Sequence, residues 1–100
     1  MTQEDVKQAL MNIIQEIQAK LEHECPPLDG ETSPLKDIPK FDSKLGVLAT
    51  ARLAQKLEVD IPHKENIFVD EKTKAKLSLD AIAVKVCAIA KPLSGKEQAA

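Results

Sequence analysis

Apolar residues recur at helical spacing in three separate stretches of this chain, with polar residues between them. The first stretch follows Thr2-Gln3-Glu4-Asp5, which has the Thr-x-x-acid form of a capping box, and it stops at Cys25-Pro26-Pro27. Its apolar residues are separated by three or four positions, which predicts a long amphipathic helix. They are Val6, Leu10, Ile13, Ile14, Ile17 and Leu21.

A proline-rich segment separates the first two apolar stretches. Residues 26–42 contain four prolines and one glycine, which predicts a long loop. Its apolar residues are spaced so that they can insert into a neighbouring core. They are Leu28, Leu35, Ile38 and Phe41. A floppy linker between two helices is the alternative.

The second predicted helix runs from Ser43 to about Glu58 and is more apolar than a surface helix requires. One stripe at i+4 spacing is expected to face the core and comprises Leu45, Ala49, Leu53 and Leu57. A second stripe lies on a different face and comprises Val47, Ala51 and Ala54, with Leu48 between the two stripes. One stripe is enough for the core, so the second stripe is unexplained unless it forms a second buried face, with Lys44, Arg52 and Lys56 reaching outward.

The remainder predicts an extended segment at 58–62, a minor helix and a last long helix. Ile61 is expected to be buried because Pro62 fixes the chain direction, and His63 is expected in a solvated turn. One short helix is expected near 64–69 or 71–76. Ser78 should cap a helix that Pro92 ends. The apolar face of this last helix comprises Leu79, Ile82, Ala83, Val86, Ile89 and Ala90, with Cys87 as a small apolar filler.

Composition agrees with an all-α fold. The chain has 100 residues, two aromatic residues and 30% charged residues, which favours aliphatic helix packing in one domain over residues 1–100. We expect an ordered core over about 3–92, a flexible tail over 93–100 and a monomer. No apolar run approaches the roughly 20 residues of a membrane span. Arg52 is the single arginine and no aromatic residues accompany a basic face, so a nucleic-acid partner is not expected.

The two cysteines are expected to be free thiols. Cys25 and Cys87 follow an N-terminus that is polar and acidic, which indicates a cytoplasmic protein. His23 and Cys25 lie close in sequence, but without a second His/Cys cluster at ligand spacing no metal site is expected.

The segment Lys40-Phe41-Asp42-Ser43-Lys44 joins the loop to the second helix. Asp42 or Ser43 can cap that helix, and this is the simplest interpretation of the pair. However, Asp37-Ile38-Pro39-Lys40-Phe41-Asp42-Ser43 leads into a helix, and Ile61-Pro62 follows at the eighteenth and nineteenth positions after the serine. This pattern resembles the acyl carrier protein family, in which Asp-Ser opens a helix and Ile-Pro follows at the same offset.

The resemblance implies a four-helix bundle with a long loop between its first two helices and a short third helix. It also implies that Ser43, flanked by Asp42, carries 4′-phosphopantetheine from coenzyme A, whose thiol holds an acyl group as a thioester. A phosphopantetheinyl transferase, an acyl-loading ligase or transferase and downstream acyl-processing enzymes would be the partners. The docking residues implied for these partners are Lys44, Val47, Leu48, Ala51, Arg52 and Ile61.

The chain departs from the family at three places. Lys44 replaces an exposed apolar residue, Lys40 replaces a glycine, and Arg52 with Lys56 occurs where the family is rich in acids. A specialised carrier, serving a dedicated pathway, is therefore preferred to the housekeeping carrier of fatty acid synthesis. An aminoacyl or peptidyl carrier that uses Ser43 and an unmodified interaction module stay open. A hydrolase using Ser43 with His23 or His63 is disfavoured, because no oxyanion-hole glycine pattern accompanies these residues.

Overall fold

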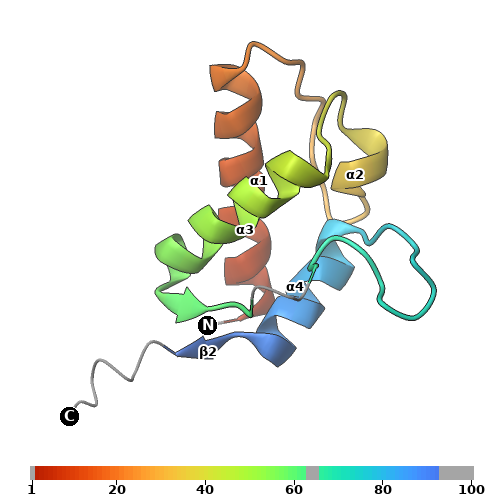
Figure 1. The fold of residues 1–100 in the computed structure, drawn as a ribbon. Helices are drawn as coiled ribbons and strands as arrows, with labels where there is room; N and C mark the ends of the chain where they lie inside the picture. Colours follow the sequence, from red (N-terminus) through yellow and green to blue (C-terminus); the bar gives the residue numbers. More distant parts are fainter. Residues whose placement is uncertain (1, 63–65, 93–100) are drawn as a thin grey trace.

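Three long helices make up most of the fold in the computed structural model, which describes residues 2–62 and 66–92 (Figure 1). They are α1 (Gln3–Lys20), α3 (Ser43–Leu57) and α4 (Leu79–Ile89), and a four-residue helix α2 (Pro34–Asp37) lies in the loop between α1 and α3. Two short strands, β1 (Val59–Asp60) and β2 (Lys91–Pro92), pair antiparallel after α3 and α4. The mostly helical fold agrees with the all-α prediction.

Helix α1 packs against both α3 and α4 and supplies the largest part of the core. Its capping box is confirmed, because Thr2 Oγ1 accepts a hydrogen bond from the Asp5 N–H and the Asp5 side chain accepts one from the Thr2 N–H. Lys7 also forms an ion pair with Asp80 on α4, with an N–O distance of 3.1 Å. The α1 residues buried in this core are Val6, Ala9, Leu10, Ile13, Ile14, Ile17 and Gln18.

Helix α1 ends earlier than the proline signal predicted. Its last helical residue is Lys20, and Glu22 then adopts a left-handed conformation with φ 59°. The His23 N–H returns to the Gln18 carbonyl at 2.8 Å, which satisfies one of the free carbonyls of the last turn. Leu21 is consequently 45% exposed instead of buried with the rest of the apolar stripe.

The loop between α1 and α3 is held down along its length, so the floppy-linker alternative is wrong. Ile38 and Phe41 are buried in the core, while Leu28 and Leu35 pack against it, as predicted. The Gly30 and Thr32 carbonyls accept the N–H groups of Asp80 and Leu79, both at 2.8 Å. The loop therefore satisfies donors at the start of α4 that the helix itself cannot use.

A buried glutamine ties both ends of this loop to α1. Gln18 is fully buried, and its Nε2 donates to the Glu24 carbonyl at 2.7 Å and to the Pro39 carbonyl at 2.9 Å. Glu24 lies just after α1, whereas Pro39 lies four residues before Ser43. One side chain thus fixes where the chain leaves α1 and where it approaches α3.

The segment 66–77 consists of turns and one isolated bridge, Val69 to Lys76, and contains no helix. The expected short helix is therefore absent from 71–76 and from the described part of 64–69. Ile67 and Phe68 are buried, because this segment inserts its apolar residues into the core. Asp70 Oδ1 accepts the N–H groups of Lys72 and Thr73, and these hydrogen bonds, that of Lys72 first, lower the pKa of the Asp70 carboxyl.

The last helix and its Ser78 cap are confirmed, but the helix ends at Ile89, so Ala90, which was expected on its apolar face, lies just outside it. The Ser78 side chain caps α4 by accepting from the Ala81 N–H, and Ala90 follows the helix in an extended conformation. Val59 then pairs with Pro92 and Asp60 with Lys91. His63, in the expected turn, and the expected tail over 93–100 lie outside the described residues.

We predict that Gln18→Met lowers the free energy of unfolding by about 1–3 kcal/mol, because it keeps the side-chain volume but leaves two carbonyls without a donor. Urea denaturation of both proteins measures this difference. The control is Gln15→Met, an exposed position on the same helix, where the change should stay within about 0.5 kcal/mol. Equal effects at the two positions would mean that the Gln18 hydrogen bonds contribute nothing.

Candidate functional site

Ser43 is the first residue of α3, and its side chain is exposed. Asp42 supplies the cap, because its Oδ1 accepts the Leu45 N–H at 3.0 Å. The Ser43 hydroxyl has no hydrogen-bond partner among residues 2–62 and 66–92. Since the neighbouring aspartate performs the capping, the serine hydroxyl is accessible to another molecule.

The turn before Ser43 is held from both sides. Pro39 is bound through its carbonyl to Gln18, and the buried Phe41 ring contacts Phe68 with a centroid distance of 5.8 Å. Between them Lys40 adopts φ 61°, a left-handed conformation that favours glycine. The turn therefore requires the backbone geometry of glycine, although its residue is a lysine.

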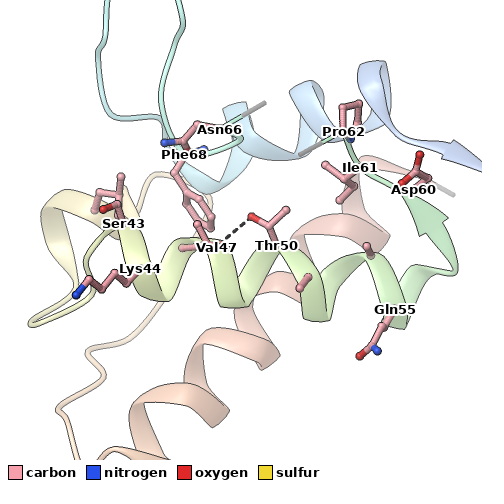
Figure 2. Close-up of a pocket in the computed structure, with 14 residues that line it drawn as sticks. Ser43, Lys44, Val47, Thr50, Gln55, Asp60, Ile61, Pro62, Asn66 and Phe68 are labelled. Atoms are coloured by element: carbon pink, nitrogen blue, oxygen red, sulfur yellow. Dashed lines mark hydrogen bonds between the residues drawn. The ribbon is translucent and has the colours of Figure 1, made fainter. Parts of the chain in front are cut away.

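A groove of about 680 Å³ begins at Ser43 and follows one face of α3. Figure 2 shows Phe68 descending toward α3 and Ile61 reaching into the groove, with Thr50 beneath them, whereas Lys44 and Gln55 point away. The volume falls within the range of about 300–1,000 Å³ that is usual for small-molecule sites. The lining residues are Leu35, Ser43, Lys44, Gly46, Val47, Thr50, Ala51, Ala54, Gln55, Asp60, Ile61, Pro62, Asn66 and Phe68.

The floor of the groove is apolar because its polar groups are already paired. The Thr50 hydroxyl donates to the Gly46 carbonyl at 2.8 Å, which leaves its methyl group to the groove. Gly46 is buried beneath the Phe68 ring, and a Cβ at this position would lie 3.2 Å from Phe68 Cδ2. The missing side chain lets the aromatic ring close the groove near Ser43.

Two of the three residues in the second apolar stripe of α3 face solvent, so the alternative of deep burial on both sides is wrong, although Ala54 is half-buried against the core. Val47 is 70% exposed and Leu48 is 39% exposed, and Ala51 is also exposed. Lys44 is exposed beside them, and Arg52 is half-buried. By contrast, Ala49 and Leu53 of the first stripe are fully buried, as predicted.

Ile61 does not belong to this exposed surface. It is 5% exposed, which confirms the predicted burial but contradicts its assignment to an exposed docking surface. Its side chain instead forms part of the groove wall. The cause is Pro62, which turns the preceding residue into the core as the chain leaves α3.

The other candidate side chains do not gather at Ser43. His23 and Cys25 do not line the groove, and burial raises the pKa of the Cys25 thiol. Cys87 is half-buried against the core. Across the described ranges, no group of three or more His, Cys, Asp or Glu side chains could hold a metal ion. None of the helices there is both long and apolar enough to cross a bilayer.

The groove and the helix start place different groups near Ser43. Among the described residues that line the groove there is no histidine or cysteine, and His63 lies outside the described residues. The position of Ser43 at a helix N-terminus does favour a negatively charged substituent such as a phosphate. An anionic group on the Ser43 oxygen would therefore be stabilised by the start of α3.

Two features of the site were not identified from the sequence. Gln18 follows Ile17 within the apolar stripe of α1, and its place among buried residues was the only available signal. Phe68 belongs to the apolar run for which a short helix near 64–69 was expected, so its place in the groove was not predicted, and only Gly46 hinted that a bulky group approaches α3. Comparisons with protein-family models, with curated proteins and with solved structures found no match to this chain.

We predict that Lys40→Gly raises the free energy of unfolding by about 0.5–1 kcal/mol. The substitution removes the cost of a left-handed side-chain-bearing residue, and the greater entropy of glycine in the unfolded chain offsets part of this gain. Chemical denaturation provides the measurement. Lys36→Gly, at an exposed helical position in α2, is the control and should be destabilising by about 0.5–1 kcal/mol. A loss of stability in both variants would contradict the proposed strain at Lys40.

Proposed function

We propose that this chain is a specialised acyl carrier protein that holds an acyl group as a thioester on 4′-phosphopantetheine attached to Ser43. The observation that carries this proposal is the exposed, unpaired Ser43 hydroxyl at the mouth of an apolar groove. The resemblance of the Asp42-Ser43 and Ile61-Pro62 pattern to the carrier family adds to it. The protein performs no chemistry itself and presents its cargo to separate enzymes.

The attachment reaction is a phosphoryl transfer from coenzyme A. The Ser43 oxygen forms a bond to the β-phosphorus of the pyrophosphate, the bond from that phosphorus to the bridging oxygen breaks, and 3′,5′-adenosine diphosphate leaves. The serine proton is lost to a base of the transferase. The product is a phosphodiester anion, which the start of α3 stabilises through its free N–H groups and the helix dipole.

The groove favours an aliphatic acyl cargo over an aminoacyl or peptidyl one. Its walls are formed by Val47, Ala54, Ile61 and Phe68, and Thr50 presents no unpaired donor to it. An apolar chain in this groove gains about 25 cal/mol for each Å² of surface removed from water. A charged amino group would lose hydration against these apolar walls, and Asp60 is the one described acidic residue of the lining that could pair with it.

We further propose that α1, α3 and α4 keep the arrangement of the carrier bundle. In this assignment the turn-rich segment 66–77 takes the place of the short third helix, and its Phe68 forms the wall opposite α3. Helix α2 is then an additional turn in the long loop before Ser43.

We predict that a promiscuous phosphopantetheinyl transferase with coenzyme A and Mg²⁺ adds one phosphopantetheine arm to the chain and none to Ser43→Ala. Intact-mass spectrometry reads the product directly. Ser33→Ala is the matched control, because Ser33 also precedes a helix but its side chain forms no cap hydrogen bond, and this variant should be modified like the native chain. Absence of modification on the native chain would favour the unmodified interaction module.

We predict that loading an octanoyl group onto the modified chain shifts the amide resonances of groove residues. Two-dimensional NMR of the pantetheinyl and octanoyl forms should show changes at Thr50, Ala54 and Ile61. Gln8 and Asn12 lie on the exposed side of α1, so their amide resonances should not shift and provide the internal control. Changes limited to residues adjoining Ser43 would mean that the acyl chain stays in solvent.

A further inference from the structure

Positive charge is concentrated on the helix that begins at Ser43. Helix α3 carries Lys44, Arg52 and Lys56, and all 16 acidic residues of the chain lie outside its 15 positions, although the whole chain has a net charge of −2. None of these three cations forms an ion pair with a residue that the structure describes. The nearest acids in sequence are Asp42, which caps the helix, and Glu58, which follows it.

Two of these cations, Lys44 and Arg52, lie beside the exposed apolar residues of the same helix, whereas Lys56 lies near α1. Val47 and Leu48 follow Lys44, and Arg52 lies one turn beyond Leu48 on the same side. Lys40 is exposed on the other side of Ser43. A protein that reaches the Ser43 hydroxyl along this side of α3 meets a small apolar strip with Lys44 and Arg52 beside it.

We propose that the partner enzymes of this chain receive α3 on an acidic surface, in which carboxylates border a hollow for Val47 and Leu48. This inference rests on the proposed carrier function and names the chemistry of its partners. Opposite charges accelerate encounter by about 10- to 1,000-fold at low salt and penalise a partner with a basic surface. Lys44 then acts as a positioning residue, because it lies next to the atom on which the partner enzymes act.

Two other occupants of this surface are disfavoured by the same residues. A second copy of the chain joined through a twofold axis would place the positive surface around Lys44 and Arg52 against the same surface of the other copy, which is repulsive. An anionic membrane would require a whole apolar face. Among the residues of α3, all of which the structure describes, Val47 and Leu48 are the only large apolar side chains that are exposed.

The test uses the full, unmodified chain and two synthetic helical peptides with the same leucine stripe, one bordered by glutamates and one by lysines. NMR titration should show the acidic peptide binding at least about tenfold more tightly at low salt, with shifts at Lys44, Val47 and Leu48. Its binding should weaken as salt is added, because exposed charges are screened over about 10 Å at 0.1 M.

Charge reversal provides the matched comparison. Lys44→Glu/Arg52→Glu should reverse the preference, so that the basic peptide binds more tightly. If this double variant does not fold, Lys44→Glu alone should reduce the native preference for the acidic peptide. Lys72→Glu/Lys74→Glu, with the same change in charge at exposed positions of segment 66–77, should keep the native preference. The inference would be overturned if both peptides bound equally or if the shifts were confined to segment 66–77. It would also be overturned if the chain associated with itself through α3, or if it bound only to phosphatidylserine vesicles. Because Ser43 is unmodified in this test, its outcome is independent of whether the transferase acts on the chain.

Discussion

The hydrogen bond from the Leu45 N–H to Asp42 Oδ1 is the interaction on which the site depends. A helix start needs a side-chain acceptor, and Asp42 provides it, so the adjacent Ser43 hydroxyl has no structural task. Had the serine been the capping residue, its oxygen would be bound to the backbone of its own helix. The division of roles between two neighbouring residues makes one of them structural and leaves the other available for modification.

The rest of the fold holds that helix start in place and shapes the space beside it. Gln18 connects α1 to the Pro39 carbonyl, and Phe41 and Phe68 pack their rings together below the turn. The same Phe68 ring lies over Gly46 and forms one wall of the groove. A single aromatic side chain from an irregular segment thus supports both the position of Ser43 and the apolar space that we assign to its cargo.

The three long helices, two of their caps and the core stripes could be predicted from the sequence because they depend on local patterns, whereas the four-residue helix α2 lies in the segment predicted as a loop. The Thr2 and Ser78 caps and the buried face of Ala49 and Leu53 are examples. The end of α1 could not be predicted in the same way. It depends on the left-handed conformation of Glu22, and the positions of the prolines do not indicate that conformation. The groove also escaped prediction, because it forms where α3 meets residues that lie far along the chain and outside any periodic segment.

The apolar run Ile67-Phe68-Val69 shows why the minor helix was expected wrongly. A short apolar run fits a helix, a strand or an inserted turn equally well by periodicity, and here it enters the core from a turn. Lys40 stands where the resembled family has a glycine, and its φ of 61° is the left-handed geometry that glycine adopts without steric cost.

The central claim is that Ser43 carries a phosphopantetheine arm in the living cell. It is tested most directly by intact-mass and fragmentation spectrometry of the protein purified from its native host under conditions that keep modifications in place. The carrier assignment predicts an added phosphopantetheine, with or without an acyl group, on the peptide that contains Ser43. A chain that is entirely unmodified, or one that carries its added group on a different residue, would contradict it.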